Sequence, residues 1–443
     1  MPLSAEIGTD SAPSIFERLE SEVRSYSRGW PTVFDQAHGA MLHDVEGTSY
    51  IDFFSGAGAL NYGHNDPVIL DAILDYLAGG RIVHSLDMST TAKAEFLERF
   101  WEVVLAPRAL DYKVQFPGPT GTNAVEAALK LARKVTGREQ VVSFTNAFHG
   151  MTLGSLAVTG NSMKRSGAGV PLAHSTALPY CSFLDEEVDS IDILRSLVAG
   201  SGSGLDLPAA VIVETVQGEG GVNVASGRWL RRLADVCTEH DMLLIVDDIQ
   251  MGCGRTGPFF SFEEAGVRPD IVTLAKSLSG SGLPLAVTLI RRDLDVWSPG
   301  EHNGTFRGNN LGFVGATAAL SYWEDDTLVR STQAAGAVVE QALRAMADEV
   351  SDALPAVEVS VRGKGLIWGL AIDAAGLAEQ VCQAAFDRHL LVETSGPDAD
   401  VVKVMPPLTV SVDDELRPGL DALAGAVHDV LSEQPTARAL ARR

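Results

Sequence analysis

The chain is short of positive charge. Its 34 lysines and arginines are set against 58 aspartates and glutamates, so the formal net charge at pH 7 is −24. Nucleic acid and anionic membranes are therefore not expected as partners. Cysteines are also few, and they show neither CxxC spacing nor the density of a disulfide framework, at Cys181, Cys237, Cys253 and Cys382. We expect reduced thiols and a cytoplasmic protein.

Long apolar runs are absent as well. No stretch reaches the roughly 18 apolar residues that a membrane-spanning helix needs. The first residues also lack the basic-then-apolar pattern of a signal peptide. The composition is that of an ordinary globular protein, with 46% hydrophobic and 21% charged residues. A length of 443 residues predicts two or three domains.

The pattern of the chain divides it into parts. From about 66 to 325, helical patterns alternate with short apolar runs, which is typical of βαβ units around a mainly parallel sheet. Beyond that, a helix near 328–350 and strand-like runs predict a smaller α+β domain. A helix is expected over 15–26. The predicted parts are a disordered tail (1–14), an N-terminal segment packing with the small domain (15–65), a large domain (66–325) and a small domain (326–443).

Four continuous apolar runs predict strands buried on both faces, at residues 141–144, 209–213, 242–246 and 271–274. They lead into residues with cofactor-binding chemistry, namely Phe148, Glu214, Asp247 and Lys276. Ligand sites in open α/β sheets lie outside the carboxyl ends of the strands, so these side chains are expected to converge. An aromatic can stack on a pyridine ring, an acid can keep its nitrogen protonated, and a lysine can form a Schiff base. Together they indicate pyridoxal phosphate (PLP).

Taken singly, each residue also has an ordinary alternative. Phe148 and His149 could be a packed aromatic and a surface histidine; His149 has no companion at metal-ligand spacing, so no metal is proposed. Asp247 or Asp248 could cap the next helix, or one of them could pair with the pyridine nitrogen. Lys276 could be solvated, although burial at the end of a strand would lower its pKa and favour a Schiff-base nucleophile.

Two loops are candidates for binding a phosphate. Residues 118–123 precede a clear helical pattern, and a helix N-terminus with Gly121 and Thr122 suits a phosphate. This loop is neither a Walker A motif nor GxGxxG, and alone it would be an N-cap. The turn-rich loop 302–310 offers Thr305 as a second ligand.

Together and in this order, the segments resemble the class III aminotransferases, the ornithine and 4-aminobutyrate type of PLP enzyme. The resemblance covers roughly residues 15–425. It rests on the loop 55–64, the phosphate loop 120–123, Phe148-His149-Gly150, Glu214 with Gln217-Gly218-Glu219, Asp247 with Gln250, the Gly-Arg-Thr-Gly at 254–257, Lys276 and Gly304-Thr305-Phe306. Within the family, residues 116–133, 249–262 and 297–310 are most similar to the L-2,4-diaminobutyrate:2-oxoglutarate aminotransferases that open ectoine biosynthesis.

The resemblance implies PLP-dependent fold type I and a homodimer with its active sites at the interface. It also implies roles for single residues: Gly121 and Thr122 on the phosphate, Thr305 on the phosphate of the partner subunit, Phe148 on the ring, Asp247 on the pyridine nitrogen, Gln250 on O3′, and Lys276 as Schiff base and proton carrier. Many relatives carry an arginine where this chain has Lys403, and lysine lacks the bidentate fork that grips a carboxylate. We expect Glu219 and Lys403 to contact the substrate.

The implied reaction moves the amino group of L-glutamate to the aldehyde of L-aspartate 4-semialdehyde. Its products are L-2,4-diaminobutyrate and 2-oxoglutarate, so the expected partners are small amino acids and oxo acids. Three alternatives stay open at this point: an ornithine- or 4-aminobutyrate-type aminotransferase, a PLP-dependent isomerase of the same fold, and a non-enzymatic relative. The presence of both Lys276 and Asp247 speaks against the last.

Overall fold

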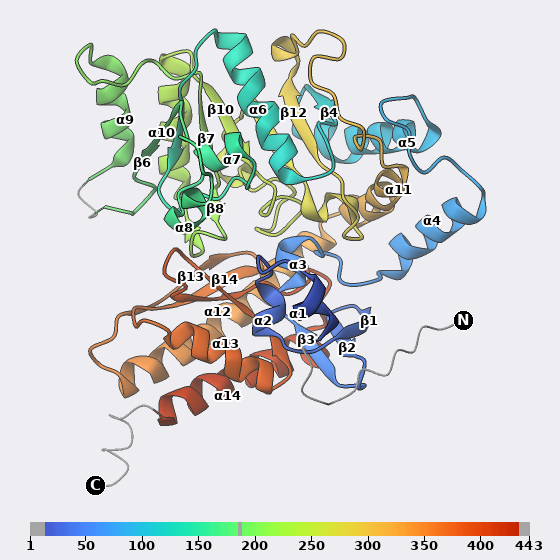
Figure 1. Ribbon diagram of the computed structural model, residues 1–443, viewed down its shortest axis with the longest axis vertical. Coiled ribbons are helices and arrows are strands. Elements are labelled where there is room, and N and C mark those ends of the chain that lie inside the picture. The colour runs from blue at the N-terminus through green and yellow to red at the C-terminus, as the bar shows by residue number, and fades with distance from the viewer. Residues whose placement is uncertain (1–13, 185–187, 434–443) are drawn as a thin grey trace.

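The structure is a computed structural model that describes residues 14–184 and 188–433. A seven-stranded sheet with the order β4-β12-β11-β10-β7-β5-β6 fills the upper part of Figure 1. Its strands are β4 (Tyr112–Gln115), β5 (Val141–Phe144), β6 (Ser175–Leu178), β7 (Ala210–Val213), β10 (Leu243–Asp247), β11 (Ile271–Leu274) and β12 (Val287–Arg291). The five adjacent strands β6, β5, β7, β10 and β11 run parallel to one another. β12 is antiparallel to both of its neighbours, β11 and β4. The predicted α/β class with a mainly parallel sheet is confirmed.

Helices cover this sheet on both faces. α6 (Gly121–Thr136) packs on one face together with Leu243 and Ile245 of β10. α10 (Gly227–Glu239) packs on the other face with Leu244 and Val246. Because successive side chains of a strand point to opposite faces, every residue of β10 is buried. The remaining helices of this part are α4 (Pro67–Ala78), α5 (Thr91–Phe100), α7 (Leu153–Ala157), α8 (Ser162–Ser166), α9 (Ser190–Ala199) and α11 (Asn310–Ala319).

A second sheet is antiparallel throughout, with the order β13-β14-β17-β16. Its strands are β13 (Val359–Lys364), β14 (Ile367–Ile372), β16 (Glu393–Ser395) and β17 (Val401–Val404). The sheet packs with α12 (Thr327–Ala353) and α13 (Leu377–Asp387), and α14 (Arg417–Glu433) packs on these two helices. These elements lie in the lower part of Figure 1. The register of β16 against β17 sets Glu393 directly opposite Lys403.

The N-terminal strands join the lower part of the molecule. β1 (Phe34–His38), β2 (Met41–Asp44) and β3 (Ser49–Asp52) form an antiparallel sheet, and β3 pairs in parallel with β15 (Leu390–Leu391). Residues more than 300 positions apart in the chain are therefore neighbours here. The pairing joins a strand of the N-terminal segment to one from the C-terminal part of the chain, and the packing of residues 15–65 with a small domain stays a prediction. The boundaries at 66 and 326 stay predictions.

The single helix predicted over 15–26 is wrong. The chain forms two short helices, α1 (Ile15–Leu19) and α2 (Tyr26–Gly29), separated by residues 20–25, of which Glu20 is extended and ends α1. The hydroxyl of Ser14 accepts a hydrogen bond from Glu17 N–H at 3.2 Å and caps α1. No residue of α1 is buried, so no packed face sustains the helix beyond its first turn.

The predicted disordered tail, apart from Ser14, lies outside the described residues. Within the described ranges, no helix combines the length and the apolar character needed to cross a membrane.

Candidate active site

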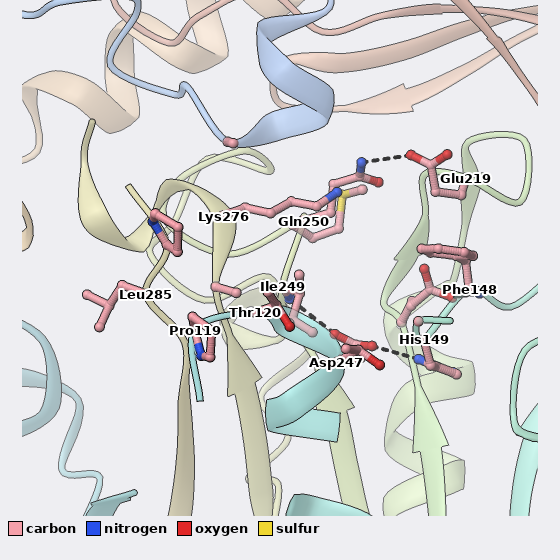
Figure 2. A pocket seen from close by; sticks show the side chains of 18 of the residues that line it. Pro119, Thr120, Phe148, His149, Glu219, Asp247, Ile249, Gln250, Lys276 and Leu285 are labelled. Atoms are coloured by element: carbon pink, nitrogen blue, oxygen red, sulfur yellow. Dashed lines mark hydrogen bonds and ion pairs between the residues drawn. The ribbon is translucent and has the colours of Figure 1, made fainter. Parts of the chain in front are cut away.

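A cavity of about 320 Å³ opens at the carboxyl ends of the central strands (Figure 2). The predicted site residues line it, except Thr305 and Lys403: they are Gly121, Thr122, Phe148, Glu214, Glu219, Asp247, Gln250 and Lys276. Residues that are scattered over 155 positions of the chain thus converge because parallel strands end at the same edge of the sheet.

The N-terminus of α6 forms one end of the cavity. Gly121 and Thr122 are its first residues, and the first N–H groups of a helix have no partner within it. The hydroxyl of Thr122 lies 2.7 Å from that of Thr152 and 2.9 Å from that of Ser155. Hydroxyls and free N–H groups at the positive end of a helix dipole suit a phosphate.

Asp247, the last residue of β10, is held in place at the floor of the cavity. It is 4% exposed, and its Oδ1 accepts hydrogen bonds from the Thr273 hydroxyl at 3.0 Å and from Ile249 N–H at 3.2 Å. Its Oδ2 lies 2.7 Å from Nδ1 of His149 (Figure 2). The carboxylate is therefore both buried and oriented, as a partner for a ring nitrogen must be.

His149 is a residue whose role the sequence did not reveal. It is 2% exposed, so the interpretation as a surface histidine is wrong. Burial disfavours the charged imidazole, but the hydrogen bond and the charge of Asp247 outweigh this and raise the pKa of His149. The sequence offered one signal of this role. His149 follows β5, so it was expected at the same edge of the sheet as Asp247.

Glu214 is a second acid that lines the cavity beside Asp247. It follows β7, and its Oε2 accepts a hydrogen bond from Phe148 N–H at 3.0 Å. Burial raises the pKa of Glu214 to about 8, partly offset by the charge of His149. The raised pKa favours the protonated form of Glu214, whereas the carboxylate of Asp247 has hydrogen-bond donors at both of its oxygens.

Lys276 extends across the cavity toward Gln250 (Figure 2). Its Nζ donates a hydrogen bond to the Ala57 carbonyl at 2.7 Å, and burial lowers the pKa of Lys276. Its backbone has φ of +49°, a left-handed conformation that costs a side-chain-bearing residue about 1–2 kcal/mol. A buried amine with a lowered pKa is a nucleophile at neutral pH.

Gln250 contacts both the N-terminal segment and Glu219. Its Nε2 donates to the Ala57 carbonyl and to Glu219 Oε1, both at 2.9 Å. Ala57 belongs to the loop 55–64, which makes a left-handed turn at Gly56 and Ala57. The N-terminal segment therefore supplies a carbonyl that both Gln250 and Lys276 contact.

Lys403 lies behind Glu219 and does not line the cavity. Its side chain is fully buried, and its Nζ is 2.8 Å from Oε1 of Glu219 and 2.8 Å from Oε1 of Glu393. Burial opposes charge on all three groups. The two carboxylates nevertheless hold the pKa of Lys403 above its ordinary value, and Lys403 holds the pKa of Glu219 below its own. Glu393 was not among the predicted site residues.

Thr305 lies apart from this cavity. It is exposed, and its carbonyl accepts a hydrogen bond from Nε2 of His84 at 2.8 Å. The predicted contact with a phosphate in the partner subunit stays a prediction.

Comparison with known proteins shows the family of this chain. Residues 24–427 match the family aminotransferase class-III, and the chain belongs to that family. Among curated relatives, a diaminobutyrate--2-oxoglutarate transaminase from Streptomyces anulatus is 59% identical over 95% of this chain and 99% of its own. One of the same name from Virgibacillus pantothenticus is 55% identical over 95% of this chain and 100% of its own.

Solved structures show the same fold. The ornithine aminotransferase from Toxoplasma gondii ME49 superposes with a TM-score of 0.81 at 25% identity, over 95% of this chain and 94% of that one. A second structure of the T. gondii enzyme has a TM-score of 0.80 at 26% identity, over 94% and 93%, and is described as showing partial occupancy of PLP at its active site. The predicted family and fold type I are confirmed.

Proposed function

We propose that this chain is a PLP-dependent aminotransferase acting on L-glutamate and L-aspartate 4-semialdehyde, giving 2-oxoglutarate and L-2,4-diaminobutyrate. One observation carries the proposal: relatives named for this reaction are 55–59% identical to the chain over nearly its whole length. The ornithine- and 4-aminobutyrate-type alternatives and an isomerase have no comparable support.

The donor set of the cavity fits PLP. A phosphate requires hydrogen-bond donors, which the N-terminus of α6 offers through Gly121 and Thr122. A protonated pyridine nitrogen requires a carboxylate partner, and Asp247 is the proposed one because His149, Ile249 and Thr273 orient its carboxylate in the cavity. An aldehyde requires an amine that is not fully protonated, which Lys276 supplies.

Each residue then has a defined task. Asp247, oriented by His149, holds the ring nitrogen, Phe148 packs on the ring, and Gln250 contacts the phenolic oxygen. When bound, PLP withdraws electrons from the carbon that bears the amino group, so that carbon loses its proton more easily. Lys276 takes this proton and returns it, because its Nζ is the basic atom reaching into the cavity.

Glu219 and Lys403 are proposed to distinguish the two substrates. Glutamate reacts through its α-amine and brings its α-carboxylate close to the cofactor, whereas diaminobutyrate reacts through its terminal amine and brings no such group. In the structure Glu219 stands between the cavity and Lys403. Movement of Glu219 would expose Lys403 to the α-carboxylate of glutamate, and the closed pair suits diaminobutyrate.

A screen of amino donors and acceptors with the purified protein tests the function. We expect glutamate and aspartate semialdehyde to be the best pair, with ping-pong kinetics. Turnover of an amino acid without any amino acceptor would show an isomerase. A clear preference for ornithine or 4-aminobutyrate over diaminobutyrate would overturn the assigned substrate.

A further inference from the structure

Glu126 lies one helical turn after Thr122 on α6 and belongs to a cluster of hydrogen-bonded side chains behind the active-site cavity. Its Oε1 accepts hydrogen bonds from the Thr152 hydroxyl at 2.6 Å and from Ser155 N–H at 3.1 Å. The hydroxyls of Thr152 and Ser155 in turn lie 2.7 Å and 2.9 Å from that of Thr122. Of these residues only Thr122 lines the cavity, so any effect of the others on a cofactor is indirect.

The hydrogen bonds of this cluster have a defined direction. A carboxylate only accepts hydrogen bonds, so Thr152 gives its single hydroxyl proton to Glu126. Ser155 directs its hydroxyl proton to the Thr122 carbonyl, at 3.3 Å. Both hydroxyls therefore face the Thr122 hydroxyl as acceptors, and its proton points to them rather than into the cavity. The side chain of Thr122 thus ties the first turn of α6 to residues 152–155 and leaves the N–H groups of that turn for a phosphate.

Two glycines allow the backbone of residues 150–155 to approach α6 closely enough for this tie. Gly150 has φ of +128°, and a Cβ on it would lie 2.5 Å from Oγ1 of Thr122. A Cβ on Gly154 would overlap the carboxylate of Glu126. A side chain at either position would push the segment away from α6, so both glycines are required for the hydrogen bonds of the cluster.

We propose that Glu126 is a positioning residue for the phosphate of PLP. Through Thr152 and Ser155 it holds the side chain of Thr122, and this fixes the N–H groups of the first turn of α6 in the arrangement that a phosphate requires. A helix terminus that is already fixed binds its ligand more tightly, because no ordering has to accompany binding. The inference rests on the proposed function, since PLP supplies the phosphate.

Binding of PLP and of pyridoxal, which lacks the phosphate, to the cofactor-free full-length protein tests this role. The Kd of pyridoxal divided by the Kd of PLP measures the contribution of the phosphate. Glu126→Ala and Glu126→Gln both remove a negative charge, but only the alanine variant loses the acceptor oxygen. The ratio should therefore be about tenfold lower in Glu126→Ala than in Glu126→Gln, roughly the value of one hydrogen bond. A purely structural role would weaken both ligands alike, and equal ratios in the two variants would overturn the inference.

Two further variants test whether Glu126 acts through Thr122. Thr152→Val, at an exposed position, cuts the tie between them and should lower the ratio as Glu126→Ala does. In a Thr122→Val background, Glu126→Ala should lower the ratio less than about twofold, because the hydroxyl that it holds is already gone. An unchanged ratio in Thr152→Val would overturn the inference, also where Glu126→Ala fails to fold, and so would additive effects of Glu126→Ala and Thr122→Val. A wild-type protein that binds PLP no more tightly than pyridoxal would instead overturn the cofactor of the proposed function.

Discussion

Replacing Lys403 by alanine is expected to damage the glutamate half-reaction more than the diaminobutyrate half-reaction. The side chain is fully buried and is the cation behind Glu219, so it is the group that glutamate's α-carboxylate would reach when Glu219 moves. A hydrogen bond between charged groups contributes about 1.5–3 kcal/mol. Its loss corresponds to a decrease of about 10- to 150-fold in kcat/KM for glutamate.

The same substitution also carries a cost in stability. Lys403 lies 2.8 Å from both Glu219 and Glu393, and its removal leaves two buried carboxylates facing each other. Breaking a buried ion pair by removing one partner costs about 3–5 kcal/mol. The cost should shrink at lower pH, because protonation of a carboxylate relieves the repulsion.

The substitution Glu219→Ala should have the opposite effect on the two half-reactions. Lys403 keeps Glu393 as a partner in this variant, so the buried charges stay balanced and the protein should remain folded. A lysine that is permanently open to the cavity favours carboxylates, so the diaminobutyrate half-reaction should lose more than the glutamate half-reaction. The difference between the two half-reactions should be limited, because Glu393 still pairs with Lys403 in this variant.

Stopped-flow spectra of the separate half-reactions measure both effects. The double variant Lys403→Ala with Glu393→Gln separates folding from function. It should recover stability, since one of the two opposing charges is gone, without recovering the glutamate half-reaction. Equal losses in both half-reactions for Lys403→Ala and for Glu219→Ala would refute the reasoning that this pair tells the substrates apart.

Four further predictions concern the cofactor site. Borohydride reduction and peptide mapping should find the cofactor fixed to Lys276, and a label on another lysine would refute the assignment. Asp247→Asn should keep the fold, by circular dichroism, while lowering turnover about 100-fold or more; near-normal activity would make Asp247 a structural cap. Mixing Lys276→Ala with Thr305→Ala subunits should restore activity if Thr305 acts across a dimer, and no recovery despite subunit exchange would count against a shared site. The pKa of Glu214 is raised to about 8 by burial, so its contribution to stability is complete below about pH 4.5 and is lost as pH rises to about 8. Glu214→Gln should accordingly flatten the pH dependence of unfolding over that window in the cofactor-free protein, and an unchanged slope would contradict it.

The strands of the site were predictable because their environment leaves a local mark. β5 and β11 have the predicted bounds, β7 begins one residue later than predicted, and β10 is shifted by one residue at both ends. Burial on both faces makes nearly every position apolar, with Ser143 and Thr273 as exceptions, and this pattern can be recognised without knowing the neighbours. The polar residue at which each run stops then predicted the edge where the site lies.

Residues that depend on pairing could not be predicted in this way. Glu393 meets Lys403 through the register of β16, a strand of three residues with no marked pattern. α1 and α2 were joined in the prediction because a helical pattern does not show that its apolar face has nothing to pack against. In both cases the deciding contact is between segments far apart in the chain.

The sequence also could not decide which of three acids carries the charge at the ring nitrogen. Asp248 follows Asp247 directly, yet burial raises the pKa of Asp248 to about 7, and its Oδ1 accepts no hydrogen bond from the described residues. Its Oδ2 accepts from Ser261 N–H at 3.0 Å, and it does not line the cavity. Glu214 faces the cavity, but burial raises its pKa to about 8, and its Oε2 accepts a hydrogen bond from Phe148 N–H. Asp247 alone of the three combines a place in the cavity with donors on both oxygens, from Thr273, Ile249 and His149. The residue types supply the candidates, and burial and hydrogen bonding favour Asp247 as the proposed partner of the ring nitrogen.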